Sequence, residues 1–375
     1  MRFDFEQYTF FDNHTHLLDM QKTQVTVDEF ISNYYHGIVP RKAAAGEHLP
    51  YQGVVMSLVN LMSRYLDCET DLESVVEARN ALTSTPEKLK EYIRKMYADG
   101  GIIGTMLDCE LPMGHPDTKC FPCETFRLFQ YEKPFFKLLE TEDNYDDLLQ
   151  KEMDAVTTAA REGFAGLKGH IAERFGMDVY YVSAEQARGK FAAAKAGDRQ
   201  AVKEVYFAMF SELLVLCAEL DIPVHLHTGS SGMGKFREVY ELDPIRMANY
   251  LMDERFARTK VIFLHGSYPF IRHSAMMAFN FPNVYMDLSQ TIPWDSMTLS
   301  NIFEDAIALA PHDKLILGSG QHFYSETSWL AAKTAKNALA WTMDKLVEQN
   351  MLNEKQAEKS ARMILSENAM RLYRK

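Results

Sequence analysis

Eight short apolar runs, separated by longer segments with helical periodicity, constrain the fold of this chain more than any other feature. The runs lie at residues 8–14, 101–108, 125–131, 164–170, 222–228, 260–266, 283–289 and 314–319. Helical patterns between them lie at 144–162, 200–220, 244–256 and 330–347. This alternation is typical of βα units around a parallel sheet, and eight such units close into a barrel. We therefore predict an α/β fold, a (β/α)8 TIM barrel.

The gap between the first two runs is far longer than one crossover connection needs. It spans about residues 17–100 and contains helical patterns at 26–35, 52–66 and 71–97. The chain shows no internal repeat and no Pro/Ser-rich linker, which favours one domain over two. We predict a single domain, residues 1–375, with a helical insertion at about 17–100 beside or over the barrel mouth.

The charge of the chain excludes several kinds of partner. The formal net charge of −12 repels phosphate backbones and anionic lipid heads. No apolar run approaches the roughly 18 residues of a membrane span. We therefore expect a small-molecule substrate and neither nucleic acid nor a membrane as partner. A homo-oligomer is compatible with these features, but none of them decides the oligomeric state.

The five cysteines indicate a reducing compartment. Their number is odd, and the first residues, "MRFDFEQYTFFDNH", carry acids where a signal peptide would be apolar. Cys120 and Cys123 form a CxxC pair, but no second pair lies at zinc-ribbon spacing. We interpret the pair as free thiols in a loop, and the protein as cytoplasmic.

Histidines cluster at the ends of the predicted strands, where barrel enzymes carry their chemistry. The first run ends in His14 and His16, and alternation along a strand directs both imidazoles to one face. His227 closes the fifth run, and His265 the sixth. Each histidine alone could simply cap a strand end through a carbonyl. Several converging imidazoles instead favour a divalent metal, Zn²⁺ or a similar ion.

Lys168 ends the fourth run two residues before His170. A lysine that points into a mouth lined by histidines would repel a cation unless it were neutral or chemically changed. A carbamate at N6 would turn it into an anionic bridge between two metals. Alternatively, Lys168 pairs with Asp287 or Glu110, or binds an acidic substrate, and the sequence leaves both interpretations open.

Other chemistries lack their motifs. The chain has no G-x-S-x-G nucleophile elbow, no Walker lysine motif and no G-x-G-x-x-G fingerprint. The stretch "GSGQHF" after the last run contains two glycines but no third glycine or lysine of a phosphate-binding loop.

Together, these segments resemble the amidohydrolase superfamily, in particular its amidohydrolase-related branch of metal-dependent hydrolases with a TIM-barrel fold. The resemblance covers "FDNHTH", "GLKGHIAERFG", "PVHLHTG", "FLHGSYPFIRHSAMMAFNFPNVYMDLS" and "KLILGSGQH". It implies that His14 and His16 bind one divalent metal, that His227 and His265 bind a second, and that carboxylated Lys168 bridges the two.

The resemblance also implies substrate contacts. Arg174 matches an arginine of this branch that would bind a substrate carboxylate, and a structural salt bridge is an equal alternative. His170 lies on the same segment. Aromatic residues on the predicted mouth loops indicate an aromatic-lined pocket or a core beneath the insertion; they are Tyr268, Trp294, Phe323 and Tyr324.

The chain departs from the family after the last strand. The family has an aspartate there that binds the first metal and accepts a proton from the attacking water, whereas this chain has Gly320. Three donors per metal still remain, the usual number in catalytic zinc sites. The general base is therefore missing or replaced, with His322 as first candidate and His225 or His170 as others.

We predict a metal-dependent hydrolase that uses metal-activated water on a C–N or C–O bond, such as that of an amide, lactone or ester. One alternative is a metal-dependent decarboxylase or other lyase of the same superfamily. Another is a non-catalytic metal-binding barrel that has lost its general base.

Overall fold

A computed structural model describes residues 2–34, 47–229 and 238–374. Within these residues, all neighbouring strands of one nine-stranded sheet are parallel, in the order β8-β7-β6-β5-β4-β3-β2-β1-β9. The strands are β1 (Phe10–Leu18), β2 (Ile102–Asp108), β3 (Glu124–Gln130), β4 (Gly166–Gly169), β5 (Val224–Leu226), β6 (Val261–Phe263), β7 (Val284–Asp287), β8 (Leu315–Ile316) and β9 (Gln321–Phe323). Each of the eight predicted runs overlaps a strand.

The last run closes the sheet into a barrel. Its strand, β8, pairs with β7, and the short strand β9, which follows the run, pairs with β1. Between β8 and β9, the N–H of Asn13 donates to the carbonyl of Leu317 at 2.9 Å. The predicted eighth run thus ends in the turn Gly318–Gly320, a further strand that was not predicted follows it, and the prediction of a (β/α)8 barrel is confirmed.

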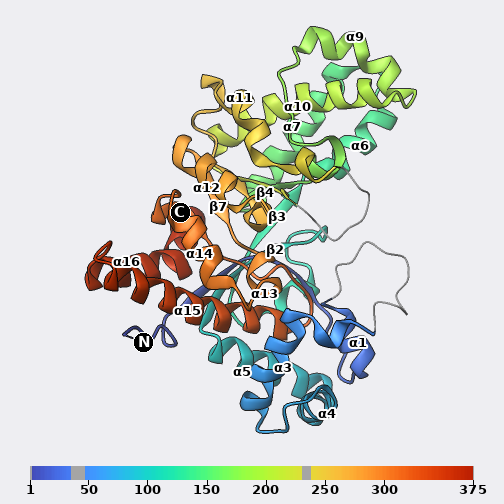
Figure 1. The fold of residues 1–375 in the computed structure, drawn as a ribbon. Helices are drawn as coiled ribbons and strands as arrows, with labels where there is room; N and C mark the ends of the chain where they lie inside the picture. The colour runs from blue at the N-terminus through green and yellow to red at the C-terminus, as the bar shows by residue number, and fades with distance from the viewer. Residues whose placement is uncertain (1, 35–46, 230–237, 375) are drawn as a thin grey trace.

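Helices surround this sheet (Figure 1). In the described residues, they are α1 (Val27–Ser32), α3 (Gly53–Leu66), α4 (Leu72–Leu82), α5 (Pro86–Asp99), α6 (Glu132–Thr141), α7 (Tyr145–Glu162), α8 (Ile171–Phe175), α9 (Ala184–Lys195), α10 (Arg199–Leu220), α11 (Ala248–Leu251), α12 (Ile271–Asn280), α13 (Thr291–Trp294), α14 (Leu299–Ile307), α15 (Ser325–Glu348), α16 (Glu354–Arg362) and α17 (Asn368–Tyr373).

Two predicted helical segments are divided in the structure. The 71–97 pattern breaks because Thr85 caps a new helix through the N–H of Lys88, and Pro86 has no N–H to continue the preceding one. The 244–256 pattern forms only short pieces, which begin after the capping residues Asp243 and Asp253.

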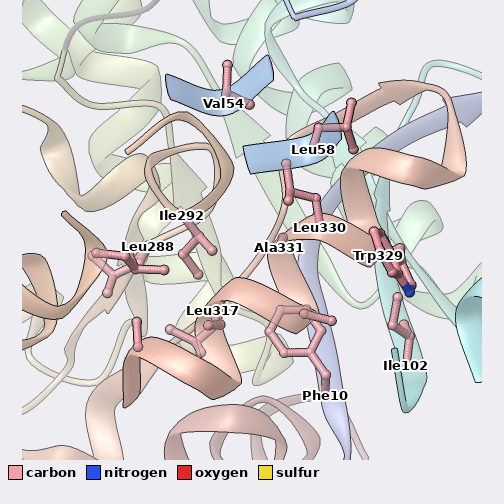
Figure 2. Packing of buried hydrophobic residues seen from close by; sticks show 14 of the residues in the cluster. Phe10, Val54, Leu58, Ile102, Leu288, Ile292, Leu317, Trp329, Leu330 and Ala331 are labelled. Carbon is pink, nitrogen blue, oxygen red and sulfur yellow. The ribbon is translucent and has the colours of Figure 1, made fainter. Parts of the chain in front are cut away.

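The described part of the predicted insertion contains α1, α3, α4 and α5, which lie between β1 and β2 in the sequence. In Figure 1, these helices lie at one end of the molecule, and α6, α7, α9 and α10 lie at the other end. Val54 and Leu58 of α3 face Leu330 of α15 in one continuous apolar core (Figure 2). The insertion is thus packed onto the barrel wall. Residue 35, the end of the predicted 26–35 pattern, lies outside the described residues.

No helix in the described ranges is long and apolar enough to cross a bilayer. The five cysteines are free thiols. Burial raises the pKa of Cys120 to about 11 and that of Cys123 to about 12, so both thiols are protonated at neutral pH. The interpretation of the CxxC pair as free thiols is confirmed.

One acidic side chain is buried in the apolar region around α7. Glu152 is fully buried, and neither of its carboxylate oxygens has a hydrogen-bond partner among the described residues. Burial raises its pKa from 4.5 to about 8. Folded protein therefore keeps this carboxyl protonated at neutral pH, whereas unfolded protein ionises it.

We predict that Glu152→Gln stabilises the protein at high pH. Unfolding releases a proton between about pH 4.5 and 8, so wild-type stability falls as pH rises through this window. The gain from the substitution should be small at pH 4 and reach a few kcal/mol, as an order of magnitude, at pH 8. Denaturant unfolding across this range measures it, with Glu162→Gln, an exposed position at the end of the same helix, as the control. Equal pH profiles for wild type and Glu152→Gln would contradict the prediction.

Candidate metal centre

Two histidines and one aspartate converge at the carboxyl ends of β1 and β2. The ligand atoms of His14, His16 and Asp108 all lie within 4.8 Å of one another. Asp108 is the last residue of β2, and the sequence analysis did not select it. Its only sequence signal is its place at the end of the second apolar run, where an acid can equally cap a strand or face solvent.

Burial keeps these imidazoles neutral. It lowers the pKa of His14 well below its ordinary value, and the neighbouring charges of His16, His265 and Lys168 lower it further. It also lowers the pKa of His16, although the charge of Asp108 opposes this shift. Neutral imidazole offers the lone pair that a metal requires.

Unpartnered polar atoms mark the same place. The Nδ1 of His14 and the Oδ2 of Asp108 are buried without a hydrogen-bond partner among the described residues. Burial would raise the pKa of Asp108, but the charges of Lys168 and His16 outweigh it and bring the pKa to about 2. Two neutral imidazoles and an ionised carboxylate form a donor set suited to zinc or a similar ion, so these residues fit a divalent metal.

Lys168 points into this mouth from β4, with 1% of its surface exposed. Its Nζ lies 3.6 Å from the Oδ2 of Asp108 and 2.8 Å from the Nε2 of His170. The alternative partners named from the sequence were wrong. Asp287 instead accepts hydrogen bonds from Asn13 and Ser289, and Glu110 pairs with Lys133.

His227 and His265 form a second group on the β5 and β6 side. The Nε2 of His265 lies 3.1 Å from the Nδ1 of His227, and the Nδ1 of His265 lies 3.2 Å from the carbonyl of Ser289. If Nδ1–H of His265 donates to that carbonyl, its Nε2 accepts from Nδ1–H of His227. The Nε2 of His227 then carries a lone pair, and it lies 3.6 Å from Glu173.

His265 reaches this position through an uncommon backbone conformation. It follows the end of β6 with φ at 67°, in the left-handed region, and Gly266 and Ser267 also have positive φ. The hydroxyl of Thr291 donates to the carbonyl of His265 at 2.7 Å. Strained backbone of this kind clusters at functional sites, where surrounding contacts maintain it.

Arg174 and His170 share one buried carboxylate, Glu132. The Nε of Arg174 donates to Glu132 at 2.7 Å, and the backbone N–H of His170 donates to it at 2.9 Å. The guanidinium of Arg174 also lies over the ring of Phe136, 4.6 Å from its centroid. The structure therefore contains the salt bridge that was the alternative to substrate binding, while 42% of the Arg174 side chain stays exposed.

The three candidate bases occupy different environments. The ring of His322 stacks on that of His16, with centroids 3.8 Å apart and planes 12° apart. His225 is fully buried, and its Nε2 lies 3.2 Å from the hydroxyl of Tyr373 of α17. His170 lies within hydrogen-bond distance of Lys168. His322 is thus the candidate that lies directly on a residue of the His14–His16–Asp108 group.

Gly320 has no room for a side chain. Its φ is +63°, and a Cβ there would lie 2.9 Å from the Cβ of Gln290 and 3.1 Å from its Cα. The turn is held from the other side, since the backbone N–H and hydroxyl of Ser319 each donate to Asp12 at 2.7 Å. Any side chain at position 320 would therefore require the turn or Gln290 to move.

The predicted mouth aromatics separate into two groups. Tyr324 is buried and stacks on Phe30 of α1, so it belongs to the core beneath the insertion. Phe323 and Tyr268 are 55% and 43% exposed. Trp294 ends α13 and packs, partly buried, against the main core.

Comparison with known families gives one match. The family model described as amidohydrolase matches residues 158–375, more than half of the chain. Protein fluG of Emericella nidulans is 28% identical over 152 residues, which are 40% of this chain and 17% of that relative. The chain thus spans only a small part of this relative's length.

Solved structures share the fold over nearly the whole chain. A protein described as a candidate metal-dependent hydrolase from Lactobacillus casei has a TM-score of 0.83 and 20% identity, covering 99% of this chain and 97% of its own. The uronate isomerase of Thermotoga maritima has a TM-score of 0.72 and 12% identity, with 98% and 95% covered. The glucuronate isomerase of Caulobacter crescentus has a TM-score of 0.69 and 13% identity, with 98% and 91% covered.

We predict that Gly320→Ala destabilises the protein more than Gly197→Ala does. Both glycines have positive φ, which costs a non-glycine residue about 1–2 kcal/mol, but nothing lies within 4 Å of a Cβ at Gly197. The contact with Gln290 should add roughly 1–3 kcal/mol at Gly320. Urea unfolding of both variants measures the difference. Equal losses would show that the turn can relax away from Gln290.

Proposed function

Because this chain belongs to the amidohydrolase family, we propose that it is a metal-dependent hydrolase that cleaves a C–N or C–O bond of a small molecule. The observation that carries the proposal is the convergence of His14, His16 and Asp108, with two ligand atoms buried and, among the described residues, without a hydrogen bond. Leaving buried polar groups without partners costs free energy, and a bound divalent ion would satisfy them.

His14, His16 and Asp108 would hold the ion, for which Zn²⁺ suits the donor set best. When bound, such an ion polarises an electrophilic carbon and lowers the pKa of water. Three protein ligands are the usual number at a catalytic zinc site. Asp108 from β2 would then supply the carboxylate that Gly320 cannot.

His322 is our candidate for the general base. Its ring stacks on His16, so it lies beside the reacting centre and could accept a proton from the attacking water. His225 and His170 suit this role less, because a ring nitrogen of each already faces Tyr373 or Lys168. For substrate contacts, we propose the exposed part of Arg174, with His170 and Trp294 at the mouth.

Whether Lys168 is an ammonium or a carbamate determines how many metal ions the site would hold. As an ammonium, it balances the charge of Asp108 and leaves donors for one ion. Carboxylated at N6, it would offer oxygens toward His16 on one side and toward His227 and His265 on the other, for two ions. Metal stoichiometry together with ¹³C-bicarbonate labelling separates these states, since only the second predicts two ions and a labelled carbamate.

We predict that purified protein contains zinc or a similar ion, and that Asp108→Asn lowers its affinity for Zn²⁺ by more than about tenfold. The substitution keeps the size of the side chain and removes its charge. His312→Gln is the matched control, because His312 precedes β8 at the opposite end of the barrel and bonds to Ser360. Elemental analysis and chelator competition give the affinities, and a wild-type protein that binds no metal would overturn the proposal.

We further predict that metal-loaded protein hydrolyses members of a panel of amides, lactones and esters, and that His322→Ala lowers kcat roughly 10²- to 10⁴-fold. Uronates are tested separately for isomerisation, because proteins of the same fold are described as a uronate isomerase and a glucuronate isomerase. Release of CO₂ from carboxylic acids would favour the lyase alternative. Tight metal binding without any turnover would favour a binding protein.

A further inference from the structure

Arg79 is a fully buried arginine of the helical insertion. It lies on α4, and its Nε donates to the Oε1 of Glu326 at 2.8 Å. The side chains of both residues are almost completely inaccessible to solvent, at 2% and 0%. Glu326 is the second residue of α15, directly after the segment that carries His322.

The same guanidinium also binds the segment that follows β1. Its Nη1 donates to the carbonyl of Thr23, and its Nη2 donates to the carbonyl of Lys22, each at 3.3 Å. Thr83 supports this contact, because its hydroxyl donates to the carbonyl of Thr23 at 2.6 Å. One side chain therefore joins the chain after β1 to the chain after β9.

These two strands carry the stacked imidazoles of the candidate site. His16 lies on β1 and His322 on β9, and the strands pair at Leu18 and Phe323 near their ends. The N–H of Asp19 donates to the carbonyl of Phe323 at 2.9 Å. The contacts of Arg79 thus lie just beyond the paired ends of the strands that place His322 on His16.

A buried ion pair is a weak source of stability, because desolvation of both charges offsets their attraction. What this ion pair contributes here is the fixed geometry of the groups that it joins. A guanidinium presents its donors in a rigid planar fork, so bonds from different nitrogens fix the directions of several acceptors at once. The rings of Tyr92 and Tyr324 flank the group, with centroids 5.9 and 5.7 Å from its central carbon.

We propose that Arg79 is a positioning residue that holds the ends of β1 and β9 so that His322 stacks on His16. The helical insertion then sets the geometry of the mouth without contributing an atom to the reaction. The inference rests on the proposed function, in which His16 binds the metal and His322 moves a proton.

The test compares Arg79→Met with Lys336→Met. Lys336 is a matched control, because it is equally buried and donates to the carbonyls of Glu6 and Gly100, which precede β1 and β2 at the far end of the barrel. Two measurements are made on each protein: affinity for Co²⁺ with its visible spectrum, and amide hydrogen exchange in peptides covering residues 17–26 and 320–328.

We expect Arg79→Met to bind Co²⁺ about 10- to 100-fold more weakly than wild type, with an altered spectrum. Exchange should become faster in both peptides together. Lys336→Met should destabilise the fold and leave both measurements at the mouth unchanged. Wild-type affinity, spectrum and exchange in folded Arg79→Met would overturn the proposal.

A third measurement separates positioning from general stability. If Arg79 acts through His322, then Arg79→Met should lower kcat much less in a His322→Ala background than in wild type. If the two substitutions instead lower kcat by fully additive free energies, Arg79 does not act through His322.

If Arg79→Met does not fold, Arg79→Lys and Glu326→Gln replace it. Arg79→Lys keeps the positive charge and removes the planar guanidinium, whereas Glu326→Gln keeps a polar side chain and removes the negative charge of the partner. A wild-type protein that binds no Co²⁺ would overturn the proposed function, and the exchange measurement would still decide whether Arg79 joins the two segments.

Discussion

The close approach of β1 to the turn Gly318–Ser319–Gly320 is the contact on which the mouth of this barrel depends. A Cβ on Gly318 would lie 2.7 Å from the Cβ of Ser289 and 2.9 Å from the backbone nitrogen of His14. Only glycine allows the chain after β8 to pass between these groups, and Asp12 of β1 then accepts hydrogen bonds from Ser319 in this turn. This closure brings the ring centroid of His14 on β1 to 5.1 Å from that of His265, which follows β6.

Desolvation then determines what the gathered side chains can do. Several imidazoles and the side chain of Lys168 share a space from which water is largely excluded, so protonation of the imidazoles is disfavoured. Asp108 is the buried carboxylate that faces them, and Lys168 and His16 keep it ionised. Neutral nitrogen donors beside one ionised carboxylate form an environment that attracts a divalent cation. The helical insertion adds rigidity, because its core is continuous with that of α15 (Figure 2).

The sequence predicted most strands well because they are short and mostly buried, and such runs are easy to separate from amphipathic helices. Helix ends were harder to predict, as Thr85 and Pro86 show, because capping and proline act within one or two residues.

At the site, the H-x-H spacing identified His14 and His16, but Asp108 was missed. A single acid after an apolar run has no distinctive spacing, and only the pairing of β2 with β1 shows that it faces those histidines. Gly320 was recognised as the place of a missing aspartate, but the obstruction by Gln290 depends on a contact that no sequence pattern reveals.

Our central proposal is that His14, His16 and Asp108 together hold a divalent metal. Anomalous diffraction from crystals of the zinc-loaded protein, recorded on both sides of the zinc absorption edge, tests it most directly. We expect a zinc peak in contact with all three side chains, and no peak at this position in crystals of Asp108→Asn grown at limiting zinc. A wild-type crystal with no peak there, or with zinc bound only elsewhere, would contradict it.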